Sequence, residues 1–417
     1  MKLYHNVGFA VIADFEKSWE ISGATGRRRA IWYNTQFKMK TKQFWYPLPE
    51  RLIAQHPAER RGTERMMVLH RDTGMIEHRH IADIVEYITA NDLLVVNDTK
   101  VFPARLLGKW ADSDGAIEVL MVSAAPAAES TAVESDQLPS MSTEGLVWNV
   151  IIGSGRKCRE GQLAVFGPQG ELRVRLLKPL SGIGMWRVEF ICERPLMDLL
   201  DEFGHTPVPP YVKREGTAAE EKEDRERYQT IYAREVGSVA APTAGLHFTP
   251  EIFAALEAKG VRRVAVTLHV GPGTFRPVKA DNIEDHQMDF EAFTVPPEAA
   301  EAINACKARG GRVFCVGSTT VRTLETVAAG LESQGTGNRE QGTDVVAAGC
   351  GASNIFIYPP YRFRVCDCML TNFHLPQSTL IMMVSALAGR ERVLCAYAMA
   401  VQKNYMFFSY GDCMLIV

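Results

Sequence analysis

Four short segments place hydroxyl, glycine and histidine residues beside apolar runs. They read APTAGLHF (241–248), GPGTF (271–275), GSTT (317–320) and HLPQST (374–379). Each follows a predicted strand or precedes a predicted helix. Small hydroxyl residues at a helix start leave backbone N–H groups free to bind an anion. The pattern predicts a polar ligand site, although ordinary helix capping uses the same residue types.

Histidines and acids in the same region could transfer protons. His247 and His269 are candidates for the general acid or base, and Glu284, Asp285 and His286 form a second set. A histidine beside carboxylates is a good acid–base candidate, whereas a lone histidine is more often structural. We expect these side chains and the four segments to converge on one cavity.

Small and polar residues of the four segments would hold the ligand. In parallel α/β sheets the carboxyl ends of the strands meet at one edge and bind ligands there. No segment matches a dinucleotide or nucleoside-triphosphate loop, which disfavours those ligands. The candidate contacts are Thr243, Gly245, Gly271, Gly273, Thr274, Ser318, Thr319, Thr320, Asn372, His374 and Ser378.

The pattern of apolar runs and turn residues along the chain predicts the fold that positions these residues. From residue 236 onward apolar strands alternate with helices, which favours a mixed or mainly parallel α/β domain, barrel-like in outline, that we assign to 39–101 and 196–417. Short β-like runs separated by turns fill 102–195 and predict an inserted small antiparallel β-barrel. Residues 123–145 have the composition of a disordered hairpin tip. We interpret 1–38 as a poorly packed N-terminal extension.

The charge balance limits how a nucleic acid could bind. The chain has 417 residues and a net charge of −3, so it carries no global positive field. An RNA would need a local patch of cations, with solubilising surface charge as the alternative interpretation. The candidate contacts are Arg60, Arg61, Arg65, Lys213 and Arg214.

Cysteine usage points to a reduced compartment. The nine cysteines are an odd number and lie mostly in apolar runs, which is typical of buried thiols. Cys366 and Cys368 have no second pair at zinc spacing, so we expect core residues and no metal site. No apolar run approaches the length of a membrane span.

Long segments, ordered along the chain, resemble the S-adenosylmethionine:tRNA ribosyltransferase-isomerase family. The resemblance runs from about residue 39 to the C-terminus. The segments that carry it are YPLPERLIAQHP (46–57), NDTKVFPARLLG (97–108), YQTIYAREVGSVAAPTAGLHF (228–248), VTLHVGPGTFRPV (266–278), VGSTTVRTLE (316–325), LTNFHLPQSTLIMMVSALAG (370–389) and FFSYGDCMLI (407–416).

The resemblance implies a specific reaction. The ribosyl part of S-adenosylmethionine would be transferred to 7-aminomethyl-7-deazaguanine at the wobble position of a tRNA and isomerised. The product would be epoxyqueuosine-tRNA, with release of adenine and methionine. S-adenosylmethionine would be a co-substrate, without a prosthetic group or a metal. It also implies an α/β domain with an inserted β-barrel. We expect a cytoplasmic monomer without a membrane partner.

The sequence departs from the family pattern at three positions. Asp289 and Met406 stand where a histidine and an arginine are usual, and Glu64 stands where a serine is usual. Roles in proton transfer or phosphate binding are therefore in doubt at Asp289 and Met406. Two alternatives stay open: another S-adenosylmethionine-dependent tRNA modification enzyme, such as a methyltransferase, and a non-catalytic RNA-binding protein with the barrel as its platform.

Overall fold

The structure is a computed structural model that describes residues 38–124, 146–275, 278–333 and 345–417. The chain divides into two compact units, 1–38 and 39–417, and all elements below belong to the second. The predicted extension lies outside the described residues except for Lys38. Most of the predicted hairpin tip does too, but Ser123 and Ala124 belong to strand β6.

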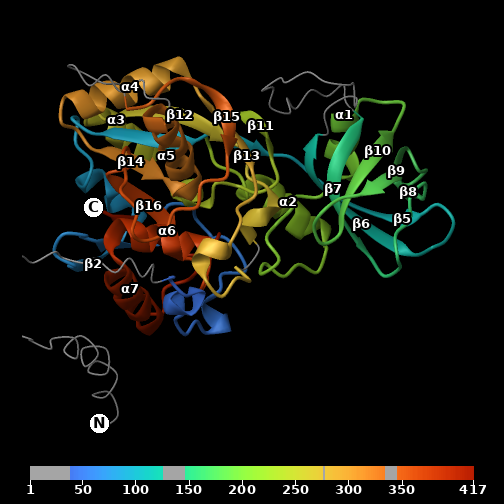
Figure 1. Cartoon of the computed structure of the whole chain (residues 1–417), viewed down its shortest axis with the longest axis horizontal. Coiled ribbons are helices and arrows are strands. Elements are labelled where there is room, and N and C mark those ends of the chain that lie inside the picture. Colours follow the sequence, from blue (N-terminus) through green and yellow to red (C-terminus); the bar gives the residue numbers. More distant parts are fainter. Residues whose placement is uncertain (1–37, 125–145, 276–277, 334–344) are drawn as a thin grey trace, which may run out of the picture. The chain divides into compact units, whose positions relative to one another are not determined.

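A nine-stranded mixed sheet forms the centre of the α/β domain (Figure 1). Its inner strands β12, β3, β14 and β16 run parallel to one another. The sheet is open, with β15 and β2 at its edges. In spatial order the strands are β15 (Gly349–Ser353), β13 (Glu291–Val295), β12 (Arg262–Leu268), β3 (Leu93–Asn97), β14 (Val313–Val316), β16 (Cys368–Asn372), β17 (Cys413–Ile416), β1 (Arg65–Leu69) and β2 (Ile76–His80).

Helices cover both faces of this sheet because successive side chains of a strand point to opposite faces. In β3, Leu93 and Val95 belong to the core under α4, α5, α6 and α7, whereas Leu94 and Val96 belong to the core under α3 and the 3₁₀ helix η3. The helices are η3 (Ile81–Glu86), α3 (Pro250–Ala258), α4 (Pro297–Ala308), α5 (Gly317–Ser333), α6 (Thr379–Ala388) and α7 (Arg390–Gln402).

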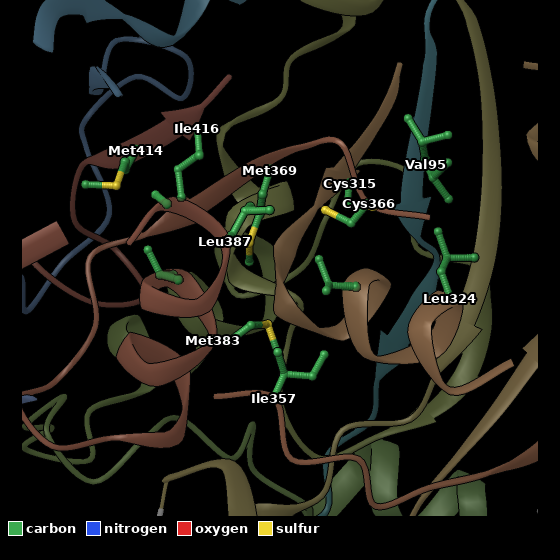
Figure 2. Close-up of a cluster of buried hydrophobic side chains, with 14 of the residues drawn as sticks. Val95, Cys315, Leu324, Ile357, Cys366, Met369, Met383, Leu387, Met414 and Ile416 are labelled. Atoms are coloured by element: carbon green, nitrogen blue, oxygen red, sulfur yellow. The ribbon is translucent and has the colours of Figure 1, made fainter. Parts of the chain in front are cut away.

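Several sulfur-containing side chains belong to the first of these cores. Figure 2 shows Cys315 and Cys366 close together, with Met369 and Met383 nearby. Both cysteines are buried, and burial is the expected environment of a structural thiol. All nine cysteines are free; Cys350 and Cys395 are exposed, so not every thiol is buried.

The closed barrel is the inserted one, and it lies between β4 (Thr99–Val101) and α1 (Leu196–Phe203) in the chain. All its neighbouring strands pair antiparallel. Trp110 and Trp148 are buried in its separate core. Around the barrel the strands are β10 (Met185–Ile191), β7 (Val147–Ser154), β6 (Ala116–Ala124), β5 (Arg105–Trp110), β8 (Leu163–Phe166) and β9 (Leu172–Pro179).

Two helix starts match the sequence signals closely, and a third begins earlier than expected. The hydroxyls of Thr249 and Ser378 cap α3 and α6 by accepting a backbone N–H from the first turn. Helix α5 begins at Gly317, whose φ of +84° favours glycine. The GSTT segment is therefore the first turn of α5 and not a loop in front of it.

The charge-dense segment after residue 213 is not a merely exposed run of charges. It contains helix α2 (Ala218–Arg227), which the Thr217 side chain caps. Asp224 on this helix is buried and forms a bidentate ion pair with Arg214. The sequence could not reveal this, because only the fold brings the Arg214 guanidinium against the Asp224 carboxylate.

Candidate active site

The carboxyl ends of the parallel strands meet at one edge of the sheet, and a narrow cavity of about 90 Å³ lies there. Three of the four predicted segments line it. The fourth, GPGTF, does not: only Val270, the residue before it, reaches this cavity, so the four segments do not all converge on one cavity as expected. The predicted residues on its wall are Thr243, Ser318, Thr319, Asn372, His374 and Ser378, joined by Tyr211, Thr371 and Ser409.

Hydrogen bonds between strand ends hold the wall of this first cavity. The Asn97 side chain donates to the Thr319 hydroxyl at 3.0 Å and accepts the Leu268 N–H at 3.0 Å. The Thr243 hydroxyl donates to Oδ1 of Asn372 at 3.2 Å. The cavity therefore presents neutral hydroxyl and amide groups at the N-terminal turn of α5, which suits a polar ligand part such as a sugar.

His374 is a neutral member of this wall. Its Nε2 lies 2.7 Å from the Thr371 hydroxyl, and its backbone N–H donates to the Tyr397 hydroxyl. Burial lowers the pKa of His374 to about 3, so the imidazole carries no charge at neutral pH. It can bond a ligand but cannot serve as an acid in the imidazolium form.

A second, larger cavity of about 730 Å³ shares Ser318, Thr319 and Leu380 with the first. Its lining is charged: Arg322 and Glu291 form a buried ion pair there. Arg322 also donates to the Ser353 carbonyl, whereas its Nε has no hydrogen-bond partner within the described part of the chain.

Two predicted acid–base residues, Asp285 and His286, also line this second cavity. His286 packs edge-on against Phe356, with ring centroids 5.2 Å apart. Burial lowers the pKa of His286, and nearby Asp289 opposes that shift. Glu284 points elsewhere and accepts the backbone N–H of Met39 at 2.9 Å. The predicted second set is therefore split.

A third cavity, of about 310 Å³, adjoins the second through Gly273, Asp289 and Glu291. His269 lines it, with Nδ1 2.8 Å from the Thr99 hydroxyl. Burial lowers the pKa of His269, so the neutral imidazole, which can accept a proton, is favoured at neutral pH.

Glycines of the GPGTF segment allow close packing around these cavities. Gly271 donates its N–H to Glu291 at 3.0 Å, and a side chain on Gly273 would require the Asp289 carboxylate to move. The Thr274 side chain lies outside the described residues.

Three further predicted residues do not line any of the three cavities described above. His247 is buried behind the wall of the first cavity, against Asn372. Gly245 packs against Tyr232 and Thr230, where a side chain would not fit. Thr320 donates its hydroxyl to the Val316 carbonyl within α5. Loops far apart in the sequence thus converge, whereas the imidazoles are distributed over separate cavities.

The predicted cations differ in their availability. Arg214 is 8% exposed in its pair with Asp224, Arg65 pairs with Asp412, and Arg61 donates to the carbonyls of Arg227 and Gln229. Arg60 and Lys213 are exposed at the surface. A guanidinium used to tie the fold together is less available for a phosphate, so Arg60 and Lys213 are the stronger candidates.

Sequence reasoning missed several lining residues. Glu291 stood at the end of the acidic segment after Asn282, and Arg322 stood in the helix after GSTT, but nothing in the sequence paired them. Phe290, 71% exposed beside the third cavity, carried no recognisable signal either. Within the described ranges no cluster of three potential metal ligands occurs. None of the described helices combines the length and apolar character that a bilayer crossing requires.

The fold and site define a class of protein: an α/β protein that binds ligands at the carboxyl edge of its sheet, with an inserted β-barrel. Residues 41–416 match the family model described as queuosine biosynthesis protein, and the chain belongs to that family.

Two relatives are named S-adenosylmethionine:tRNA ribosyltransferase-isomerase. The chain is 46% identical over 380 residues to the one from Moorella thermoacetica and 44% identical over 378 residues to the one from Acetivibrio thermocellus. Each alignment covers 91% of this chain and 100% of the relative. A crystal structure of S-adenosylmethionine tRNA ribosyltransferase from Thermotoga maritima is 33% identical. It covers 90% of this chain and 100% of its own, with a TM-score of 0.46.

Proposed function

We propose that the protein is an S-adenosylmethionine:tRNA ribosyltransferase-isomerase of queuosine biosynthesis. Relatives of that name, 44–46% identical over their whole length, are the observation that carries the proposal. The acceptor is 7-aminomethyl-7-deazaguanine at the tRNA wobble position, and adenine and methionine leave. S-adenosylmethionine is consumed as a co-substrate, and the reaction requires no metal.

The neutral and charged cavities suit different parts of S-adenosylmethionine. The first cavity offers hydroxyl and amide groups, so we place the ribose hydroxyls there. The methionine end carries a carboxylate and an ammonium group, which match the charges of Arg322 and Glu291 in the second cavity. Because Ser318 and Thr319 line both cavities, one ligand can reach both.

The reaction needs a base at the ribose 5′ carbon, where the neighbouring sulfonium acidifies the C–H group. His269 and His286 line adjoining cavities, and burial lowers the pKa of each, so each is ready to accept a proton at neutral pH. Both remain candidates for the base. Protonating either one below its lowered pKa removes the base, so kcat would fall on the acidic side and level off towards neutral pH.

Nucleoside analysis tests the function directly. The protein is incubated with S-adenosylmethionine and tRNA that carries the aminomethyl precursor, and the digest is examined for epoxyqueuosine. Adenine and methionine should appear in step with the new nucleoside. Formation of S-adenosylhomocysteine would instead identify a methyltransferase, and binding of tRNA without any turnover would favour the RNA-binding alternative.

RNA binding is expected to depend on Arg60 and Lys213, the exposed cations of the predicted patches. Each phosphate contact that is removed should lower the slope of log affinity against log salt by about 1. Filter binding of Arg60→Ala and Lys213→Ala at several salt concentrations measures this. An unchanged salt slope in both variants would exclude Arg60 and Lys213 as phosphate contacts. Arg214→Ala, which breaks the buried ion pair with Asp224, shows how far damage to the fold alone weakens RNA binding.

A further inference from the structure

His247 contacts a residue of the first cavity but does not line that cavity. It ends the 3₁₀ helix η4 (Thr243–His247), and only 2% of it is exposed. Its Nε2 lies 3.0 Å from Nδ2 of Asn372, which does line the cavity. The ring therefore faces the back of the cavity wall.

A backbone carbonyl fixes the direction of this hydrogen bond. Nδ2 of Asn372 lies 3.0 Å from the carbonyl oxygen of Phe408, which can only accept. The amide nitrogen is thus the donor on that side, and it donates to His247 as well. Nε2 of His247 must be the acceptor, so the proton of the neutral ring sits on Nδ1. Oδ1 of Asn372 is left to accept the Thr243 hydroxyl.

Glu64 stabilises that tautomer from the other side of the ring. Nδ1 lies 3.9 Å from Oε1 of Glu64 and has no hydrogen-bond partner within the described residues. Burial raises the pKa of Glu64, but the nearby imidazole and the backbone N–H groups around the carboxylate, that of Gly62 among them, together lower it below its usual range, so the carboxyl group is ionised at neutral pH. A carboxylate near Nδ1–H holds the proton on that nitrogen and orients the ring.

We propose that His247 is a positioning residue, which orients the Asn372 amide and through it the Thr243 hydroxyl on the wall of the first cavity, and that it transfers no proton in the reaction. The role requires an acceptor at the place of Nε2 and nothing else from the ring. This inference rests on the proposed function only in assigning the first cavity to S-adenosylmethionine.

Two substitutions separate positioning from proton transfer. In His247→Gln the side-chain oxygen can accept the Asn372 amide at a similar reach, so this variant should keep most of the wild-type kcat for adenine release. His247→Leu has no acceptor and should lower kcat by about 10–100-fold, the cost of misplacing a group that contacts the substrate. Asn372→Ala should lower kcat similarly, and adding His247→Leu to it should cost little more.

Contrary results are equally clear. If His247→Gln were as slow as His247→Leu, the ring would transfer a proton in the reaction. If His247→Leu kept full activity, the contact between His247 and Asn372 would make no contribution to the reaction. His205→Gln, which removes a histidine bound to Glu221 outside the three larger cavities, is the control for folding by thermal unfolding.

A crystal structure of His247→Leu provides a test without turnover. The Asn372 amide should rotate away from the Phe408 carbonyl in that variant, and an unmoved amide would overturn the proposal. If the wild type released no adenine, the proposed function would fail while this result still decided the role of His247.

Discussion

The first and second cavities share two residues of helix α5 but differ in how their walls are made. The first is lined by neutral groups, and bonds such as Asn372 to Phe408 and Thr243 to Asn372 hold it together. The second has a buried ion pair between Glu291 on β13 and Arg322 on α5. The comparison teaches that neutral polar groups can orient one another at a small cost in free energy, whereas each buried charge depends on its counterion.

The largest effect is expected from removing that counterion. Arg322→Leu leaves the buried Glu291 carboxylate without the Arg322 counterion, although the Gly271 N–H still donates to it, and takes a hydrogen bond from the Ser353 carbonyl. Loss of one member of a buried pair costs about 3–5 kcal/mol of unfolding free energy. Urea unfolding measures it, and Lys213→Leu, which removes an exposed pair with Glu50, is the control with no expected change. A loss below about 1 kcal/mol would mean that the pair is not isolated from solvent.

An intermediate effect is expected from the pH dependence of the first cavity. The pKa of His374 is about 3 in the folded protein, well below its ordinary value near 6.5, so the unfolded chain binds the proton more readily as the pH falls. Stability should therefore be lost below about pH 6.5, by about 2 kcal/mol at pH 5.

His374→Gln removes this contribution. The difference in unfolding free energy between pH 7 and pH 5 should be smaller in the variant than in the wild type. His269 and His286 titrate in both proteins, so their contributions cancel in the comparison. An equal pH dependence in both proteins would contradict the neutral, buried state of His374.

The smallest effect distinguishes capping from ligand contact. Ser378→Ala and Thr249→Ala each remove a helix N-cap and should each cost about 1 kcal/mol of stability. Only Ser378 lines the first cavity, so only Ser378→Ala should also raise KM for S-adenosylmethionine. Equal KM values in the two variants would show that Ser378 is a cap and nothing more.

Local signals in the sequence predicted several elements and two helix starts, although helix α2 and the true start of α5 became clear only in the structure. Thr249 and Ser378 cap their helices as their positions indicated, and the alternating pattern in 102–195 matched a closed barrel with Trp110 and Trp148 inside. A cap depends on residues within one turn, and a strand's pattern depends on its own neighbours, so the sequence contains the information for both, whereas closure of the barrel pairs strands far apart in the chain, such as β5 with β8.

Long-range pairing was not available from the sequence. Arg214 and Arg65 looked like surface cations until the fold placed Asp224 and Asp412 beside them. His247 looked like an acid or base until Asn372 and Glu64, each more than a hundred residues away, were found on either side of its ring. A charged or titratable side chain has the same sequence signature whether it is exposed at the surface or paired with another residue inside the fold.

The sequence by itself determined the alternation of strands and helices, the caps, the glycine positions and the segments that carry the family resemblance. The tertiary structure decided which polar groups face the cavities, which cation is buried, and on which nitrogen His247 holds its proton. The physical reason is range. Backbone preferences act between neighbours in the chain, whereas hydrogen-bond direction, desolvation and ion pairing are set by whatever the fold brings within a few ångströms.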